Sequence, residues 1–222
     1  MKKTIVMLAN SVKHGQHCVA GKDVSTKQWI RPVRDARGGE LSSEQTKCKN
    51  PHGIFPISVL QKIEMGFSQA APLINQPENH IITDETWLQR YKMDRSDLHS
   101  FLDHPEILWN NQSHSGNGEN DRVDYNQIIN RIIEIKQSLY LIEPEDAKVI
   151  IIENSDQKKR IRIFFKYKNI SYNLATTDPV LWREYSARNI GEYHFETPKI
   201  LCISLGEKFD DGFCYKLVAS AL

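Results

Sequence analysis

The chain has 222 residues, of which 40% are hydrophobic and 26% are charged, and its formal net charge is +1. This composition is typical of a globular protein and is sufficient for one large domain or two small ones. A near-neutral chain excludes a global basic excess, so any nucleic-acid surface has to be a local patch.

The pattern of apolar residues and cysteines indicates a cytoplasmic protein. Asn10, Ser11 and Lys13 interrupt the N-terminal apolar run, which is therefore too short for a signal peptide. No apolar stretch approaches the roughly 20 residues of a membrane span, so we expect no membrane partner. The four scattered cysteines indicate reduced thiols, as in a cytoplasm.

The first part of the chain, residues 1–83, contains short apolar runs separated by polar turns. Pro32 directly follows one of these runs and limits its pairing inside a sheet. These runs predict strands at residues 4–9, 18–20, 29–31, 57–67 and 79–82.

The middle part, residues 84–136, is predicted to be a helical connection. Asp84 is placed to cap a helix that carries Trp87, Leu88 and Tyr91 on one face. A second helix is expected from Ser96. Residues 110–121 contain no apolar side chain and predict a mobile surface loop.

The last part, residues 137–222, is again rich in strand signals. Residues 160–168 alternate strictly between apolar and mainly basic positions. Asp178 followed by Pro179 predicts the start of a helix. The other apolar runs predict strands at residues 138–142, 149–153, 170–175, 200–205 and 213–219.

Each end of the chain therefore has about five short strands, and the second end has a helix before its last hairpin. This count favours a mainly β protein made of two small Greek-key barrels of the OB type, joined by the helical middle segment. A single α+β domain with one larger sheet is the alternative that strand counting leaves open.

Seven short stretches that span nearly the whole chain occur in a characteristic order: LANSVK, HCVAG, WIRPV, QPENH, SLYLIEP, TDP and SLGEKFDDGFCYKLVA. Their order resembles that of the bacterial dual OB-containing domain family. The resemblance implies two OB barrels and a nucleic-acid-sensing role in defence-like or mobile-element contexts, and it supplies no catalytic residues.

Two basic-aromatic patches are candidates for binding nucleic acid. OB barrels bind single strands with a basic groove and aromatic side chains on which bases stack. The first patch consists of Lys13, Trp29, Arg31, Arg34 and Arg37, in which an indole and a guanidinium share one strand face. The alternative is a core tryptophan with a rim arginine paired to a carboxylate.

The second patch is the outward face of residues 160–168, with Arg160, Arg162, Phe164 and Lys166. The alternative for this face is a solvated strand whose charges prevent edge-to-edge aggregation.

Metal binding and nucleophilic catalysis have weaker support. Potential zinc ligands are spread over His14, His17, Cys18, Cys48 and His52 without a Cys-x-x-Cys pair. Cys18 beside His17 lacks an evident third group to orient it. We expect no metal, no cofactor and no catalytic residue.

These patterns favour a non-catalytic module that binds or senses single-stranded nucleic acid and works with an effector protein. Two alternatives stay open. The first is an enzyme that processes nucleotides or nucleic acid with His14, His17 or Cys18 near Arg31. The second is an adaptor that binds a protein partner.

Overall fold

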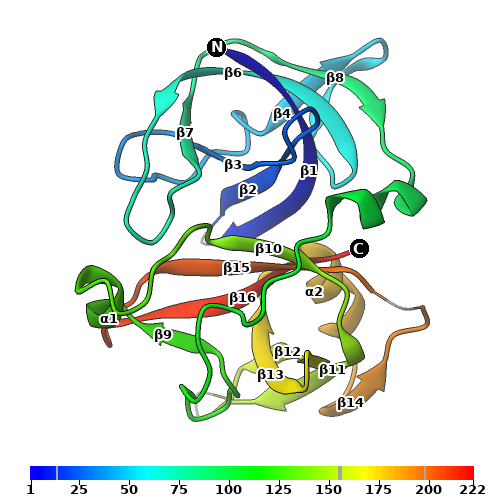
Figure 1. The fold of residues 1–222 in the computed structure, drawn as a ribbon. Helices are drawn as coiled ribbons and strands as arrows, with labels where there is room; N and C mark the ends of the chain where they lie inside the picture. The colour runs from blue at the N-terminus through cyan, green and yellow to red at the C-terminus, as the bar shows by residue number, and fades with distance from the viewer. Residues whose placement is uncertain (14, 155–156, 198) are drawn as a thin grey trace. The chain divides into compact units, whose positions relative to one another are not determined.

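Most of the apolar runs expected to be strands are strands in the computed structural model of the chain (Figure 1). The structure describes residues 1–13, 15–154, 157–197 and 199–222. The chain separates into two units, Met1–Phe101 and Leu102–Leu222. Over the described residues, each unit has its own eight-stranded sheet.

The first unit is built on a closed barrel of five strands. β1 pairs with β2, β2 with β3, β3 with β7 and β7 with β6, and β6 closes the barrel by pairing with β1. The β3–β7 pair is parallel. The elements of this unit are β1 (Lys2–Lys13), β2 (Gln16–Asp23), β3 (Trp29–Val33), β4 (Lys47–Asn50), β5 (Gly53–Pro56), β6 (Gln61–Ala70), β7 (Asn79–Ile82), β8 (Trp87–Lys92) and the 3-10 helix η1 (Arg95–Phe101).

This strand order, with parallel third and fifth barrel strands, is that of an OB barrel. Side chains such as Ile5, Ile30 and Phe67 fill its interior. Gly21 allows β2 to approach β1 closely, because a Cβ at this position would collide with the carbonyl oxygen of Val6. The glycine of the HCVAG stretch is therefore required by the close pairing of β1 and β2.

Residues 84–136 do not form the helical connection that the sequence predicts. Residues 87–92 form β8, which pairs with β6 and β4, so Trp87 is buried in the barrel core while Tyr91 is 73% exposed. The second expected helix is η1, and its Leu98 and Phe101 are buried. The boundary between the two units also falls inside this segment.

The second unit repeats the OB strand order. Its path runs β11-β12-β13-β16-β15, again with a parallel pair, β13–β16. β14 pairs with β11, and β10 pairs with β15. The elements are β9 (Arg122–Asp124), α1 (Tyr125–Ile129), β10 (Leu139–Ile142), β11 (Glu145–Glu153), β12 (Lys159–Tyr167), β13 (Ile170–Thr176), α2 (Pro179–Tyr185), β14 (Gly191–His194), β15 (Leu201–Lys208) and β16 (Phe213–Ala221).

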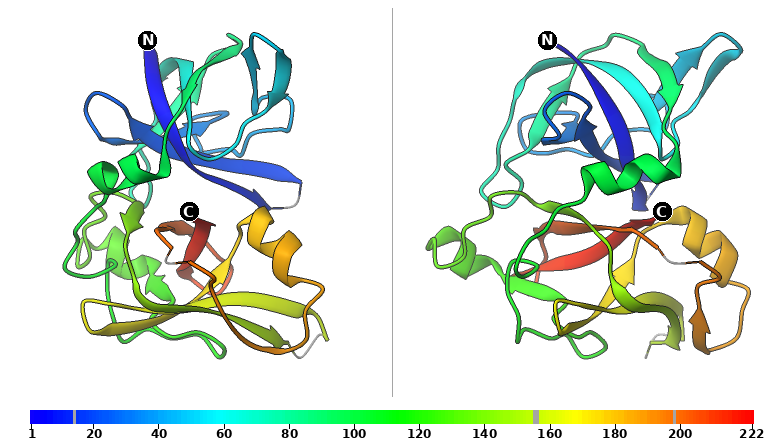
Figure 2. Two further views of the ribbon diagram at one scale, coloured as in Figure 1. Left: turned by 90° about the vertical axis from the view of Figure 1, so that its right-hand side faces the viewer. Right: turned by 45° about the vertical axis from the view of Figure 1, so that its right-hand side comes forward.

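The helix α2 lies between the third and fourth barrel strands, as the sequence predicts for an OB fold (Figure 2). Asp178 caps it by accepting a hydrogen bond from the backbone N–H of Val180, and Pro179 is its first residue.

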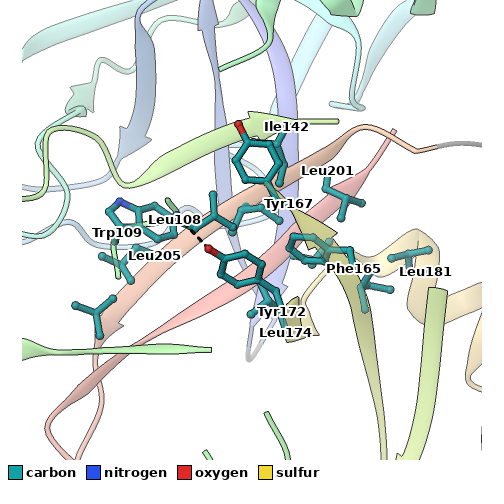
Figure 3. Close-up of a cluster of buried hydrophobic side chains, with 14 of the residues drawn as sticks. Leu108, Trp109, Ile142, Phe165, Tyr167, Tyr172, Leu174, Leu181, Leu201 and Leu205 are labelled. Atoms are coloured by element: carbon teal, nitrogen blue, oxygen red, sulfur yellow. Dashed lines mark hydrogen bonds between the residues drawn. The ribbon is translucent and has the colours of Figure 1, made fainter. Parts of the chain in front are cut away.

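The core of the second unit explains the alternation of β12. Ile161, Ile163 and Phe165 all point into the apolar cluster, and the ring of Phe165 stacks on Tyr172 at a centroid distance of 5.3 Å (Figure 3). The Tyr172 hydroxyl accepts a hydrogen bond from the backbone N–H of Leu108 at 3.3 Å. The segment before β9 thus closes this core.

Candidate nucleic-acid interface

The basic face of β12 is only partly exposed. Arg162, expected on a solvated face, is 7% exposed, and its guanidinium lies 3.0 Å from the carboxylate of Asp121. It also donates to the side-chain oxygen of Asn173 at 3.1 Å. The expectation that Arg162 lies on a solvent-exposed face is therefore wrong, because residues preceding β9 cover this part of the face.

The cover is the polar stretch of residues 110–121, which is not a free surface loop. Asp121 is 2% exposed and accepts hydrogen bonds from the backbone N–H and the hydroxyl of Ser115. Asn120 donates to the carbonyl of Ser171, and Glu119 forms a β-bridge with Asn173. Polar contacts thus attach this stretch to β13 without any apolar anchor.

The remaining positions of this face have mainly compensated charges. Phe164 is half-buried beneath the ammonium group of Lys148, which pairs with Glu192 at 2.6 Å. Lys166 is exposed and pairs with Asp146 at 3.5 Å. Arg160 is partly buried and donates to the carbonyl of Lys159. Since ion pairs neutralise much of this face, it is a weak match to a phosphate-binding groove.

Trp29 and Arg31 share one strand face, as their spacing predicts, but neither is a surface shelf. Trp29 is opposite Lys22 in the β2–β3 ladder, and the Lys22 ammonium lies 5.1 Å from the indole centroid. Trp29 is 5% exposed and Arg31 is 7% exposed. The Arg31 guanidinium lies 3.3 Å from the Glu78 carboxylate. The structure therefore agrees better with the alternative, a buried tryptophan beside an arginine paired to a carboxylate, than with an exposed binding surface.

The loop after β3 keeps two candidate arginines at the surface. Arg34 is exposed and lies 3.5 Å from the Asp35 carboxylate. The same carboxylate accepts the backbone N–H groups of Arg37 and Gly39, which lower the pKa of Asp35. Arg37 is exposed and has no ion pair within the described part of the chain. Lys13 ends β1, and its side chain lies outside the described residues.

The side chains of His17 and Cys18 contact polar side chains of the first unit. The two ring nitrogens of His17 lie 2.9 Å from the Asn10 side-chain oxygen and 3.3 Å from the Ser43 hydroxyl. Cys18 contacts the Glu40 carboxylate at 3.7 Å, and a nearby negative charge disfavours a thiolate. His14 lies outside the described residues.

The potential zinc ligand Cys48 lies in β4, whereas His17 and Cys18 lie in β2. Cys48 is buried in the core of the first barrel, and burial raises the pKa of its thiol. Where the structure describes the chain, no group of three or more His, Cys, Asp or Glu side chains is arranged to hold a metal ion.

A basic-aromatic cluster that the sequence did not indicate lies on the first unit. We call it the lysine surface: Lys22, Lys27 and Lys62, with Tyr91 and Phe101. The Lys27 ammonium lies 3.3 Å from the centroid of the Phe101 ring, and Lys22 donates to the Phe101 carbonyl at 2.7 Å. Lys62 and the exposed Tyr91 are direct partners in the β6–β8 ladder.

Lys22 and Lys62 lie close enough to Lys27 to influence its pKa. Desolvation lowers the pKa of Lys27, the positive charges of Lys62 and Lys22 lower it further, and Asp97 opposes them. This pKa direction marks a local positive potential on a near-neutral chain. The residues come from β2, the following turn, β6, β8 and η1, so no sequence window contains them.

The comparisons with known proteins agree with this architecture. The model of the dual OB-containing domain family matches residues 3–221. The search of curated proteins finds no match. No helix in the described residues is long and apolar enough to cross a membrane. The match spans nearly the whole sequence, and the chain therefore belongs to the dual OB-containing domain family.

Proposed function

We propose that this protein is a non-catalytic module that binds single-stranded nucleic acid through the lysine surface of its first unit. The observation that carries the proposal is the grouping of Lys22, Lys27 and Lys62 beside an exposed tyrosine on an OB barrel. OB-type binding combines cations that contact phosphates with aromatic rings that stack on bases.

The side chains of the lysine surface have different roles in the proposed binding. Lys27 and Lys62 supply ammonium groups for phosphates, and a phosphate between them relieves the repulsion that lowers the pKa of Lys27. Tyr91 is 73% exposed and offers a ring to one base, a contact that contributes about 1–3 kcal/mol. Lys22 is buried and holds the surface in place through its bond to Phe101.

Arg34 and Arg37 add two exposed cations on the same unit. With Lys27 and Lys62 they make four groups available for phosphates. Arg160, Phe164 and Lys166 of the second unit contribute less because their neighbouring charges are largely compensated. A sensing role would place an effector protein downstream of this binding event.

The salt dependence of binding tests the proposal. About four phosphate contacts predict a slope of log affinity against log salt of roughly −3 on single strands, at about −0.7 per contact. Fluorescence anisotropy of labelled thymidine and uridine oligonucleotides over a potassium chloride series measures it. Absence of binding at low salt, or a slope near zero, would favour the adaptor function instead.

A further inference from the structure

The β4–β5 hairpin gives the first unit an open sheet edge. β5 is the last strand in the sheet order and pairs only with β4 over the described residues. The backbone N–H of Ile57 donates to the carbonyl of Thr46. This bond determines which residue pairs of the β4–β5 ladder are hydrogen-bonded and which are not. Ile54 faces Lys49 at a non-hydrogen-bonded position, so its own N–H and C=O point away from β4.

The side chain at this edge is apolar and accessible. Ile54 is 59% exposed. An apolar edge strand with outward-facing donors and acceptors is a template for an added strand. Pro56 has no N–H and restricts the pairing to Ile54, so the backbone alone supplies little affinity.

A groove of about 320 Å³ is lined in part by Ile54 and provides side-chain contacts in addition to the backbone pairing. Its apolar part consists of Ile54, Ile82 and Trp87. The groove therefore offers apolar area next to the outward-facing backbone groups of Ile54.

The rim of the groove is acidic. Glu44, Asp84 and Glu85 line it, with Lys47 as its one lysine. Lys47 pairs with Glu44 at 2.6 Å, and Lys2 pairs with Glu85 at 3.2 Å. Asp84 has no ion pair in the part of the chain that the structure describes. This excess of negative charge repels phosphate and attracts a cationic side chain.

We propose that this groove is a docking site for an extended peptide of a partner protein, in which a basic side chain stands next to apolar ones. The peptide backbone pairs with Ile54, the aliphatic stem of its Arg or Lys lies on the apolar part of the groove, and the cationic head faces Asp84. The site is separate from the lysine surface and does not depend on the proposed binding of nucleic acid.

Two short peptides of opposite charge test the proposal on the full chain. The probes are the capped pentapeptides Val-Arg-Val-Arg-Val and Val-Glu-Val-Glu-Val, titrated into isotopically labelled protein and followed by amide NMR shifts. We expect the arginine peptide to bind at least about tenfold more tightly than the glutamate peptide, with the largest shifts at Ile54 and Trp87.

Charge reversal at Asp84 provides the matched variant. Asp84→Lys should weaken the arginine peptide by about tenfold or more, whereas Asp210→Lys, an equal charge change at an exposed position of the second unit, should leave its affinity unchanged. Equal affinities for both peptides, or shifts confined to other residues, would overturn the proposal. A further result would also overturn it: the wild-type protein binds neither peptide but self-associates, and Ile54→Lys abolishes this self-association. The sheet edge would then pair with a second copy of the chain.

Discussion

Replacing Arg162 by methionine is expected to lower the free energy of unfolding by about 3–5 kcal/mol, because it leaves the buried carboxylate of Asp121 without its cation. The two groups are 3.0 Å apart, and their side chains are 9% and 2% exposed. The same change removes the hydrogen bond to Asn173 and so loosens residues 110–121 from β13. Urea unfolding of the full chain measures the loss.

Lys166→Met is the matched control on the same strand. Its ion pair with Asp146 is exposed, with side chains 46% and 72% accessible, and such pairs contribute about 0–1 kcal/mol. Adding Asp121→Asn to Arg162→Met should recover part of the stability, since the uncompensated charge is removed. Equal and small losses in Arg162→Met and Lys166→Met would contradict the buried ion pair.

Replacing Lys216 by methionine is expected to stabilise the protein by about 1–4 kcal/mol at pH 7, because folding then no longer shifts the pKa of a lysine far below its ordinary value. Lys216 lies on the same face of β16 as Cys214 and Val218, which belong to the core, and is 1% exposed. Its ammonium donates to the Asn110 carbonyl at 2.7 Å and lies 5.3 Å from the Tyr172 ring centroid. Burial lowers the pKa of Lys216 to about 7, although Asp121 opposes the change.

The pH dependence distinguishes this lysine from other effects. The pKa of Lys216 lies below its ordinary value of 10.5, so between pH 7 and 10.5 the unfolded chain binds more protons than the folded one. The contribution of Lys216 to the free energy of unfolding should therefore rise with pH in this window, by up to about 1.4 kcal/mol per pH unit. The Lys216→Met protein should lose this rise, whereas the Lys208→Met protein, changed at an exposed lysine, should keep it. Parallel pH profiles of unfolding free energy in the wild type and both variants would disprove the lowered pKa of Lys216.

The sequence predicted those helices and strands that are determined by residues close to one another in the chain. The Asp178-Pro179 start of α2 and the alternation of β12 are both decided by neighbouring side chains, and both are confirmed. The spacing of Trp87, Leu88 and Tyr91 is that of a helix face, but these residues form the strand β8. β8 forms because β4 and β6 provide partners that a local pattern does not contain.

Local sequence patterns also did not predict which polar residues are buried, because burial depends on segments that are distant in the sequence. Arg162 is buried because a stretch without apolar residues folds over it, held by Asp121 and Asn120. A sequence shows the polarity of such a stretch but not its partners. The OB order itself was predictable, because the number of strands and the place of α2 are properties of the whole chain.

The salt slope of single-strand binding in two double variants tests the central claim most directly. Lys27→Ala with Lys62→Ala removes the two accessible cations of the lysine surface, and Lys148→Ala with Lys166→Ala removes two cations of the second unit. The first protein should bind more weakly and show a slope shallower by about 1.4, at about 0.7 per lost contact, while the second should resemble the wild type. An unchanged slope in the Lys27–Lys62 variant, together with a reduced slope in the Lys148–Lys166 variant, would contradict the assignment of binding to the first barrel.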